Sequence, residues 1–227
     1  MIEHRTFAQV QVEAIRAALG GFSNDDSDYC WNHVIRDIDP ASPIVTPFFN
    51  PEYAEIFKVF TVTGDHALRD ELLEKYPHTK QYMQEHNGRN TLYGPRVQKQ
   101  WQNLIDEAKA NKCSRRLSIS VLEADDTHLL ESKRYDLVQA EFPCTFGFKF
   151  EYMATIDGVP TYVFTAIMRS SNVVTVLPYD FAVWQHIVKM FEEATGYKVD
   201  FIDAFLMNAH VYFRENPKAL AILAAAQ

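Results

Sequence analysis

The spacing of hydrophobic residues changes near residue 115 and divides the chain into a helical half and a strand-rich half. Before that point apolar side chains recur at roughly helical spacing, with glycine, proline or asparagine between the runs. The helices predicted there cover residues 3–19, 51–62, 66–75, 79–87 and 95–112. Residues 22–50 are rich in Asp, Asn, Ser and Pro, which predicts a loop with one short strand at Ile44-Val45.

From residue 115 onward the period is two, which is typical of half-buried strands. Apolar and polar residues alternate over 117–121, and aromatic residues share one face of a second strand over 146–152. Asp157-Gly158 is a strong hairpin signal, so residues 161–169 should run back beside that strand.

The last third of the chain predicts a helix, a strand and a short helix. Pro178 should lie in the first turn of a long apolar helix that Gly196 ends. A strand over 198–213 is followed by a helix from Pro217 to Ala226, with Asn216 as its cap. Periodicity alone therefore predicts an α+β fold and no finer description.

The composition is that of one globular domain spanning residues 1–227. Of the 227 residues, 47% are hydrophobic and only 8 are glycine and 10 proline, which supplies a core and excludes a disordered or low-complexity chain. The 22 basic and 30 acidic residues leave a net charge of −8, which argues against a protein that coats DNA or an anionic membrane. A small anionic ligand in a local basic pocket is compatible with that charge.

Signals for membrane insertion, disulfides and metal binding are absent from the sequence. No apolar run reaches the ~20 residues that span a bilayer, and no charged segment precedes an apolar one at the N-terminus, so we expect a cytoplasmic protein. The cysteines are Cys30, Cys113 and Cys144, an odd number without CxxC spacing. This pattern indicates neither a disulfide framework nor a zinc site.

Cys144 is the first candidate for chemistry, because it lies between two predicted strands where a thiol can project into a cleft. A thiolate is a nucleophile, and neighbouring positive charge favours that form. Taken alone, a cysteine in this setting is more often a buried small hydrophobe.

Polar residues at the ends of other strands are further candidates. Arg115-Arg116 begins one strand and Arg169-Ser170 closes another, so two segments can present guanidinium groups, which fit phosphate oxygens. His210 and Tyr212 share a strand face and could hold a sugar hydroxyl. Each group also fits an ordinary role, as solvated strand ends or as a structural His–Tyr pair. Asp180, in the first turn of its helix, could simply favour the helix dipole.

Five motifs in order resemble those of the thymidylate synthase family. They are Tyr93-Gly94 with Gln100-Trp101, Ser114-Arg115-Arg116, Pro143-Cys144, the block from Arg169 to Ala182, and Ala209 to Tyr212. The resemblance covers about residues 88–214, with a weaker echo from residue 44. It implies an α+β fold in which a mixed sheet packs against a long central helix.

The resemblance also implies an enzyme that is a homodimer with shared active sites. Cys144 would add to C6 of a pyrimidine nucleoside monophosphate, and C5 would then attack the one-carbon unit of 5,10-methylenetetrahydrofolate. Arg169 and Ser170, together with Arg115 and Arg116 of the partner subunit, would hold the 5′-phosphate.

The family's pattern assigns three further kinds of contact. His210 and Tyr212 would hold the sugar hydroxyl, Asn172 would lie beside the nucleotide and the folate, and Tyr93 would lie on the folate side. No contact with DNA is implied.

Departures from the family's pattern point to cytosine. Uracil-specific members carry Asn where this chain has Asp180; a carboxyl group accepts from cytosine N4 and, when protonated, donates to N3. Asp at this position marks the deoxycytidylate hydroxymethylase branch. Thr145 follows the nucleophile in place of His, and Asn172 replaces the usual Asp. The folate-aligning Trp has no counterpart around residues 79–82, where Thr79, Gln81 and Tyr82 stand.

A site without that aromatic residue should favour water over hydride in the last step, which gives a hydroxymethyl product. The chain ends about fifteen residues after Tyr212, so we expect folate to be closed over by another segment. An acid/base carboxylate is expected upstream, near Thr63-Gly64-Asp65. Strict counting places Phe57 there, and a short insertion would place Glu55, our candidate, or Glu52; both glutamates also fit ordinary helix-surface charges.

The sequence thus predicts a cytidylate C5-hydroxymethyltransferase that prefers deoxycytidylate. A CMP hydroxymethylase, or a dUMP methylase or hydroxymethylase of the same family, is the alternative, because no residue reports on the 2′-hydroxyl. A catalytically silent nucleotide-binding or RNA-binding relative is the alternative outside this class. Tritium release from C5 discriminates, because a binding protein cannot exchange that hydrogen.

Overall fold

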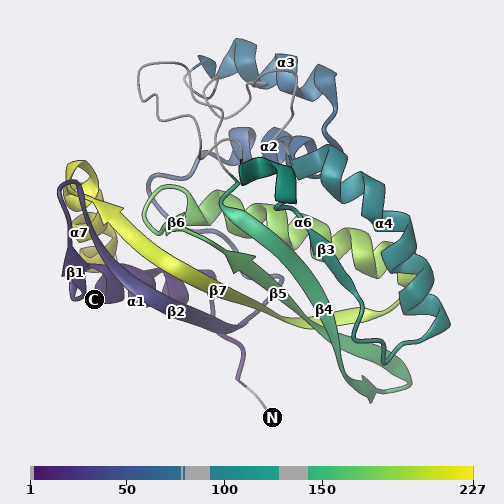
Figure 1. Ribbon diagram of the computed structural model, residues 1–227. Helices are drawn as coiled ribbons and strands as arrows, with labels where there is room; N and C mark the ends of the chain where they lie inside the picture. Colours follow the sequence, from purple (N-terminus) through teal and green to yellow (C-terminus); the bar gives the residue numbers. More distant parts are fainter. Residues whose placement is uncertain (1–2, 78, 80–92, 128–142, 227) are drawn as a thin grey trace.

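One mixed sheet forms the centre of the computed structural model, which describes residues 3–77, 79, 93–127 and 143–226 (Figure 1). The strand order is β1-β2-β7-β5-β4-β3, and β6 pairs with β7. The strands are β1 (Phe22–Ser23), β2 (Ser27–Ile38), β3 (Ser118–Ser120), β4 (Thr145–Ile156), β5 (Val159–Met168), β6 (Ser171–Asn172) and β7 (Lys198–Tyr212). Within this described sheet β7 runs parallel to β5 and β6, and the other pairs are antiparallel.

The long helix α6 connects the parallel strands β5 and β7, because parallel strands need a crossover of this kind. The other helices are α1 (Phe7–Leu19), α2 (Pro51–Thr63), α3 (His66–Lys75), α4 (Tyr93–Ala110), η2 (Ala124–Thr127), η3 (Phe213–Glu215) and α7 (Asn216–Ala225); α6 is Leu177–Thr195. Helices α2 and α4 both pack against α6, and α4 also packs directly against β3 at the edge of the sheet.

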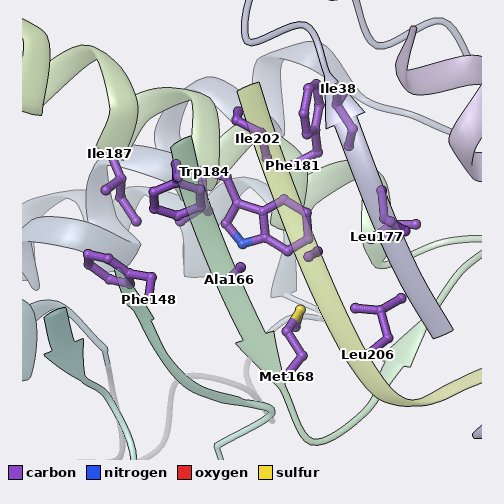
Figure 2. Packing of buried hydrophobic residues seen from close by; sticks show 14 of the residues in the cluster. Ile38, Phe148, Ala166, Met168, Leu177, Phe181, Trp184, Ile187, Ile202 and Leu206 are labelled. Atoms are coloured by element: carbon purple, nitrogen blue, oxygen red, sulfur yellow. The ribbon is translucent and has the colours of Figure 1, made fainter. Parts of the chain in front are cut away.

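The core lies between α6 and the sheet (Figure 2). Three buried residues of α6 face different strands: Ile187 lies near Phe148 of β4, Trp184 near Ala166 of β5, and Phe181 near Ile38 of β2 and Ile202 of β7. The prediction of a central apolar helix and of an α+β fold with a mixed sheet against it is confirmed. No helix in the described residues is long and apolar enough to cross a membrane.

The prediction of a loop over 22–50 is wrong, because β2 is a long strand that pairs with β7. Two features hid it. Asn32 and Asp37 adopt φ angles of 54° and 60°, and the register shifts between Ile35 and Ile38, so the alternation of buried side chains is interrupted. The predicted strand at residues 44–45 does not form.

Most other elements agree with the sequence prediction. Asp157-Gly158 forms the two-residue hairpin turn, with φ angles of 50° and 81° that suit a type I′ turn. The first helix begins at residue 7 behind a Thr6 capping box. Asn216 is the first helical residue of α7 and not its cap, which is Glu215. The helix predicted at 79–87 lies almost wholly outside the described residues.

Candidate active site

Cys144 immediately precedes β4, next to the point where β5 leads into β6. Its carbonyl oxygen accepts the backbone N–H of Arg169 at 2.7 Å. The N–H groups of Cys144 and Thr145 donate to the Tyr93 hydroxyl oxygen at 3.1 and 3.2 Å. These bonds fix the backbone around a partly buried thiol.

Tyr93 reaches this segment from the start of α4 because the backbones of α2 and α4 touch there. A Cβ at Gly94 would lie 2.1 Å from the Gly64 nitrogen, so no larger residue fits. Burial raises the pKa of the Tyr93 hydroxyl, and the charge of Cys144 adds to the rise, so the group is a neutral phenol at neutral pH. The Tyr93-Gly94 pair therefore places a neutral hydroxyl at the backbone of Cys144.

Arg169 places a positive charge beside the thiol. Its Nη2 lies 3.5 Å from the Cys144 sulfur, and its Nε donates to the Pro143 carbonyl oxygen at 3.4 Å. A guanidinium group at this distance favours the thiolate, which is the nucleophilic form. The structure brings together the thiol and the arginine that the sequence singled out.

Asp180 lies in the first turn of α6, and the Ser171 hydroxyl donates to its Oδ2 at 3.1 Å. Burial raises the pKa of the Asp180 carboxyl to about 7, and the hydrogen bond from Ser171 opposes part of the rise. The charges of Asp180 and Cys144 both contribute to the raised pKa of Tyr93, so both groups lie on the side of the site where the Tyr93 hydroxyl is placed. Near neutral pH a substantial fraction of the carboxyl is protonated, and it can then both donate and accept a hydrogen bond.

His210 and Tyr212 lie on β7 beside β6. The His210 Nδ1 is 3.2 Å from the Ser170 hydroxyl and 3.2 Å from Asn208 Oδ1, and the His210 and Tyr212 rings are 4.9 Å apart. Burial lowers the pKa of His210, so its ring is neutral at neutral pH. The four side chains form a neutral, polar group adjoining Arg169.

The Asn172 side chain forms hydrogen bonds to several other groups of the protein. Its Oδ1 accepts the N–H groups of Val174 and Thr175 at 3.0 and 3.2 Å. Its amide donates to Glu215 Oε2 at 2.6 Å and to the Thr175 hydroxyl at 3.0 Å, and that hydroxyl donates to Glu215 Oε1 at 2.8 Å. The buried Asn172 side chain thus connects the segment before α6 to the residue before α7, and its contact with nucleotide and folate stays a prediction.

Aromatic side chains adjoin Asp180 on the side of α2. The Tyr179 ring lies 5.1 Å from Tyr53 and 5.2 Å from Phe49, and its hydroxyl accepts the Asn50 N–H at 3.0 Å. Such rings can contact a planar ligand such as a pterin. Within the described residues, no group of three or more His, Cys, Asp or Glu side chains could hold a metal ion.

The decisive comparison is with protein-family models, where the thymidylate synthase model matches residues 60–225. The chain belongs to the thymidylate synthase family. A search of curated proteins found no match. Membership of this family indicates one-carbon transfer to C5 of a pyrimidine nucleotide with methylenetetrahydrofolate as the co-substrate, by enzymes that typically form dimers.

Within one chain of this thymidylate synthase family member, Arg115 and Arg116 lie far from Cys144. They precede β3, whose Ser118 pairs with Lys149 of β4, and this register places them roughly 20 Å from Cys144 at ~3.3 Å per residue. Both side chains are exposed and line a surface pocket of about 460 Å³. Within one chain they cannot complete the site around Cys144.

Glu55 lies on the exposed side of α2. Its side chain is 71% exposed and forms an ion pair with Lys58 at 2.7 Å. Glu52 is also exposed, whereas Phe57 is partly buried and its ring lies 6.4 Å from Tyr179. The structure supports the ordinary surface role for Glu55, so we do not include it in the catalytic group.

Sequence reasoning missed Ser171, Thr175 and Glu215, whose side chains support the site. Ser171 lies nine residues before Asp180, and Glu215 lies beyond the His-x-Tyr motif, so no local spacing links them. The only signal in the sequence was that two polar residues, Ser171 and Asn172, follow Ser170 before a mostly apolar stretch. Gln81, Tyr82 and the residues just before Pro143 lie outside the described part of the chain.

Proposed function

We propose that this protein hydroxymethylates C5 of a cytidine monophosphate, with dCMP as the preferred substrate. The observation that carries the proposal is Asp180, a carboxyl group with a pKa of about 7 near Cys144. When protonated it can donate to cytosine N3 and accept from the N4 amino group. The uracil-specific members that the motifs resemble carry an amide side chain at this position.

The proposed role of Cys144 is attack on C6 of the pyrimidine. Arg169 Nη2, 3.5 Å from the sulfur, favours the thiolate that makes this attack. Addition at C6 gives C5 the electron density with which it takes up the one-carbon unit. Loss of the C5 proton and release of the one-carbon unit from tetrahydrofolate would leave an exocyclic methylene at C5. Addition of water to this methylene with elimination of the Cys144 thiolate from C6 then restores the aromatic ring and frees the enzyme.

The nucleotide's phosphate and sugar are assigned to the neighbouring residues. Arg169 and Ser170 are proposed to bind the 5′-phosphate together with Arg115 and Arg116 of the partner subunit. The exposed position of this arginine pair, away from the site of its own chain, supports donation to a second subunit. His210 and Tyr212 are proposed to bind the sugar hydroxyl.

A homodimer is proposed for a second reason, which is the apolar surface of the sheet edge. Phe22 and Trp31 are 56% and 60% exposed, their rings stack at 4.9 Å, and Val34 on the same strand as Trp31 is also exposed. Exposed apolar groups of this kind mark interaction surfaces. We assign them to contact with a second copy.

Methylenetetrahydrofolate supplies the one-carbon unit when bound, and the aromatic group around Tyr179 suits its planar ring. Of the two residues expected to contact it, Asn172 has its amide and its carbonyl oxygen engaged by the protein, and the Tyr93 hydroxyl oxygen accepts two backbone N–H groups. Capture of the resulting C5 methylene by water gives the hydroxymethyl product, whereas hydride would give a methyl group.

The test is a folate-dependent assay with dCMP, CMP and dUMP supplied separately, with products identified by mass. Gain of CH₂O on dCMP supports the proposal, and gain on CMP would move the preference to the ribonucleotide. Gain of CH₂ on dUMP would refute it. Cys144→Ser should abolish tritium release from C5 and leave nucleotide binding largely intact; binding without any exchange in the unaltered protein would indicate a silent relative.

A further inference from the structure

A protonated carboxyl group does not by itself choose between cytosine and uracil. It carries one donor and one acceptor, and moving the proton from one oxygen to the other reverses the pattern. Cytosine needs a donor toward N3 and an acceptor toward the N4 amino group, whereas uracil needs an acceptor toward N3–H and a donor toward O4. Discrimination therefore requires a group that determines which oxygen of Asp180 holds the proton.

Ser171 has the geometry for this role. Its hydroxyl donates to Asp180 Oδ2 at 3.1 Å, and its side chain is buried, with 3% exposure. Pairing of Ser171 with Ala209 and the bonds of Asn172 to Glu215 hold the backbone of β6 on both sides of the hydroxyl. Elsewhere in the described residues, no side chain donates to Asp180.

The hydrogen bond from Ser171 favours one arrangement of the carboxyl proton. A carbonyl-type oxygen is a better acceptor than a protonated one, so donation to Oδ2 places the proton on Oδ1. Oδ2 retains a second lone pair, because a carboxyl oxygen accepts more than one hydrogen bond. A ligand amino group can therefore share Oδ2 with Ser171.

We propose that Ser171 is a specificity-determining residue, which keeps the proton of Asp180 on Oδ1 so that the carboxyl presents a donor to cytosine N3 and an acceptor to its N4 amino group. The inference rests on the proposed function and adds a residue that acts through Asp180. Without Ser171, both proton arrangements of the carboxyl become available, and the uracil pattern competes with the cytosine pattern.

The experiment compares Ser171→Ala with the unaltered enzyme, using the ratio of kcat/KM for dCMP to that for dUMP. We expect the ratio to fall about five- to tenfold, which corresponds to one neutral hydrogen bond. The same ratio is measured as dissociation constants in a Cys144→Ser background, where no turnover occurs. Each ratio compares dCMP with dUMP on the same protein preparation. A smaller folded fraction therefore affects both nucleotides equally and leaves each ratio unchanged.

Two variants serve as controls. Ser171→Thr keeps the hydroxyl and should keep the ratio, and Ser118→Ala removes an exposed serine of β3 and should leave both rate and ratio unchanged. An enzyme that prefers dCMP and keeps its ratio in Ser171→Ala overturns this inference and leaves the proposed function standing. An unaltered enzyme that prefers dUMP overturns both.

Discussion

Exchanging the amide and the carboxyl of the Asn172–Glu215 pair should leave the protein stable, although each single substitution destabilises it. In Asn172→Asp a second carboxyl group faces Glu215 Oε2 across the present 2.6 Å contact. In Glu215→Gln the amide can turn its oxygen to Asn172 and its nitrogen to the Thr175 hydroxyl. The double variant restores a matched pair, because the new amide at position 215 donates to the new carboxyl at position 172.

The sizes of these effects follow from burial and from the number of bonds lost. Both side chains are no more than 9% exposed. Asn172→Asp removes two donated hydrogen bonds and opposes two buried carboxyl groups, which should cost about 3 kcal/mol. Glu215→Gln keeps both contacts in neutral form and should cost about 1 kcal/mol. The double variant should also lie within about 1 kcal/mol of the original, a coupling of about 3 kcal/mol.

The assay is urea unfolding of the four proteins, with KM for the nucleotide as a second measurement because Ser170 adjoins the pair. Glu55→Gln is the matched control: it removes a carboxyl from an exposed ion pair, should change stability by less than about 1 kcal/mol, and should leave turnover unchanged. Additive effects of the two substitutions would refute the assigned contact. A loss of turnover in Glu55→Gln would restore that glutamate as the catalytic candidate.

Three further predictions concern a buried ion pair, the carboxyl and the tyrosine. Asp126→Ala leaves the buried Arg96 guanidinium without its two-pronged partner at 2.7 and 2.8 Å, so the free energy of unfolding in urea should fall by about 3–5 kcal/mol. Binding of dCMP to the Cys144→Ser variant should be constant below pH 7 and weaken above it, because the Asp180 proton is lost as pH rises through its pKa of about 7; a flat calorimetric profile would contradict this. Tyr93→Phe removes the acceptor of two backbone N–H groups and should lower stability by about 1–3 kcal/mol and also lower kcat, as measured by thermal unfolding and C5 tritium release.

Elements with regular periodicity could be predicted from the sequence, and those with local irregularities could not. The long helix α6 and the hairpin at Asp157-Gly158 combine a clear apolar pattern with clear end signals. Strand β2 carries left-handed residues at Asn32 and Asp37, which shift its side chains between faces and remove the period of two. The pairing of β2 with β7 determines the structure of this segment, and the sequence of β2 alone does not indicate that pairing.

The candidate site shows the same limit. Cys144 and Arg169 were identified from motif and charge, and the structure brings them to 3.5 Å. Glu55 was chosen by assuming a short insertion relative to the family's motif, because strict counting places Phe57 at that position, and the structure shows Glu55 exposed. Asn172 was assigned to ligands from the family's motif pattern; its hydrogen bond to Glu215 could not be predicted, because the two residues are 43 apart in sequence and only the fold brings them together.

The four consecutive residues 169–172 explain how one short segment organises the site. Arg169 and Ser171 reach Cys144 and Asp180, the groups assigned to the base, whereas Ser170 and Asn172 reach His210 on β7 and Glu215 just beyond it. Ser171 and Asn172 form β6, and their alternation is what an extended backbone produces, because successive side chains of a strand point to opposite sides. A shift of one residue in the pairing of β6 with β7 would exchange the sides to which Ser171 and Asn172 point, so the register at Ser171 and Ala209 positions both side chains together. The buried bonds of Asn172 hold that register, and for this reason substitutions at Asn172 should affect nucleotide binding through the position of β6.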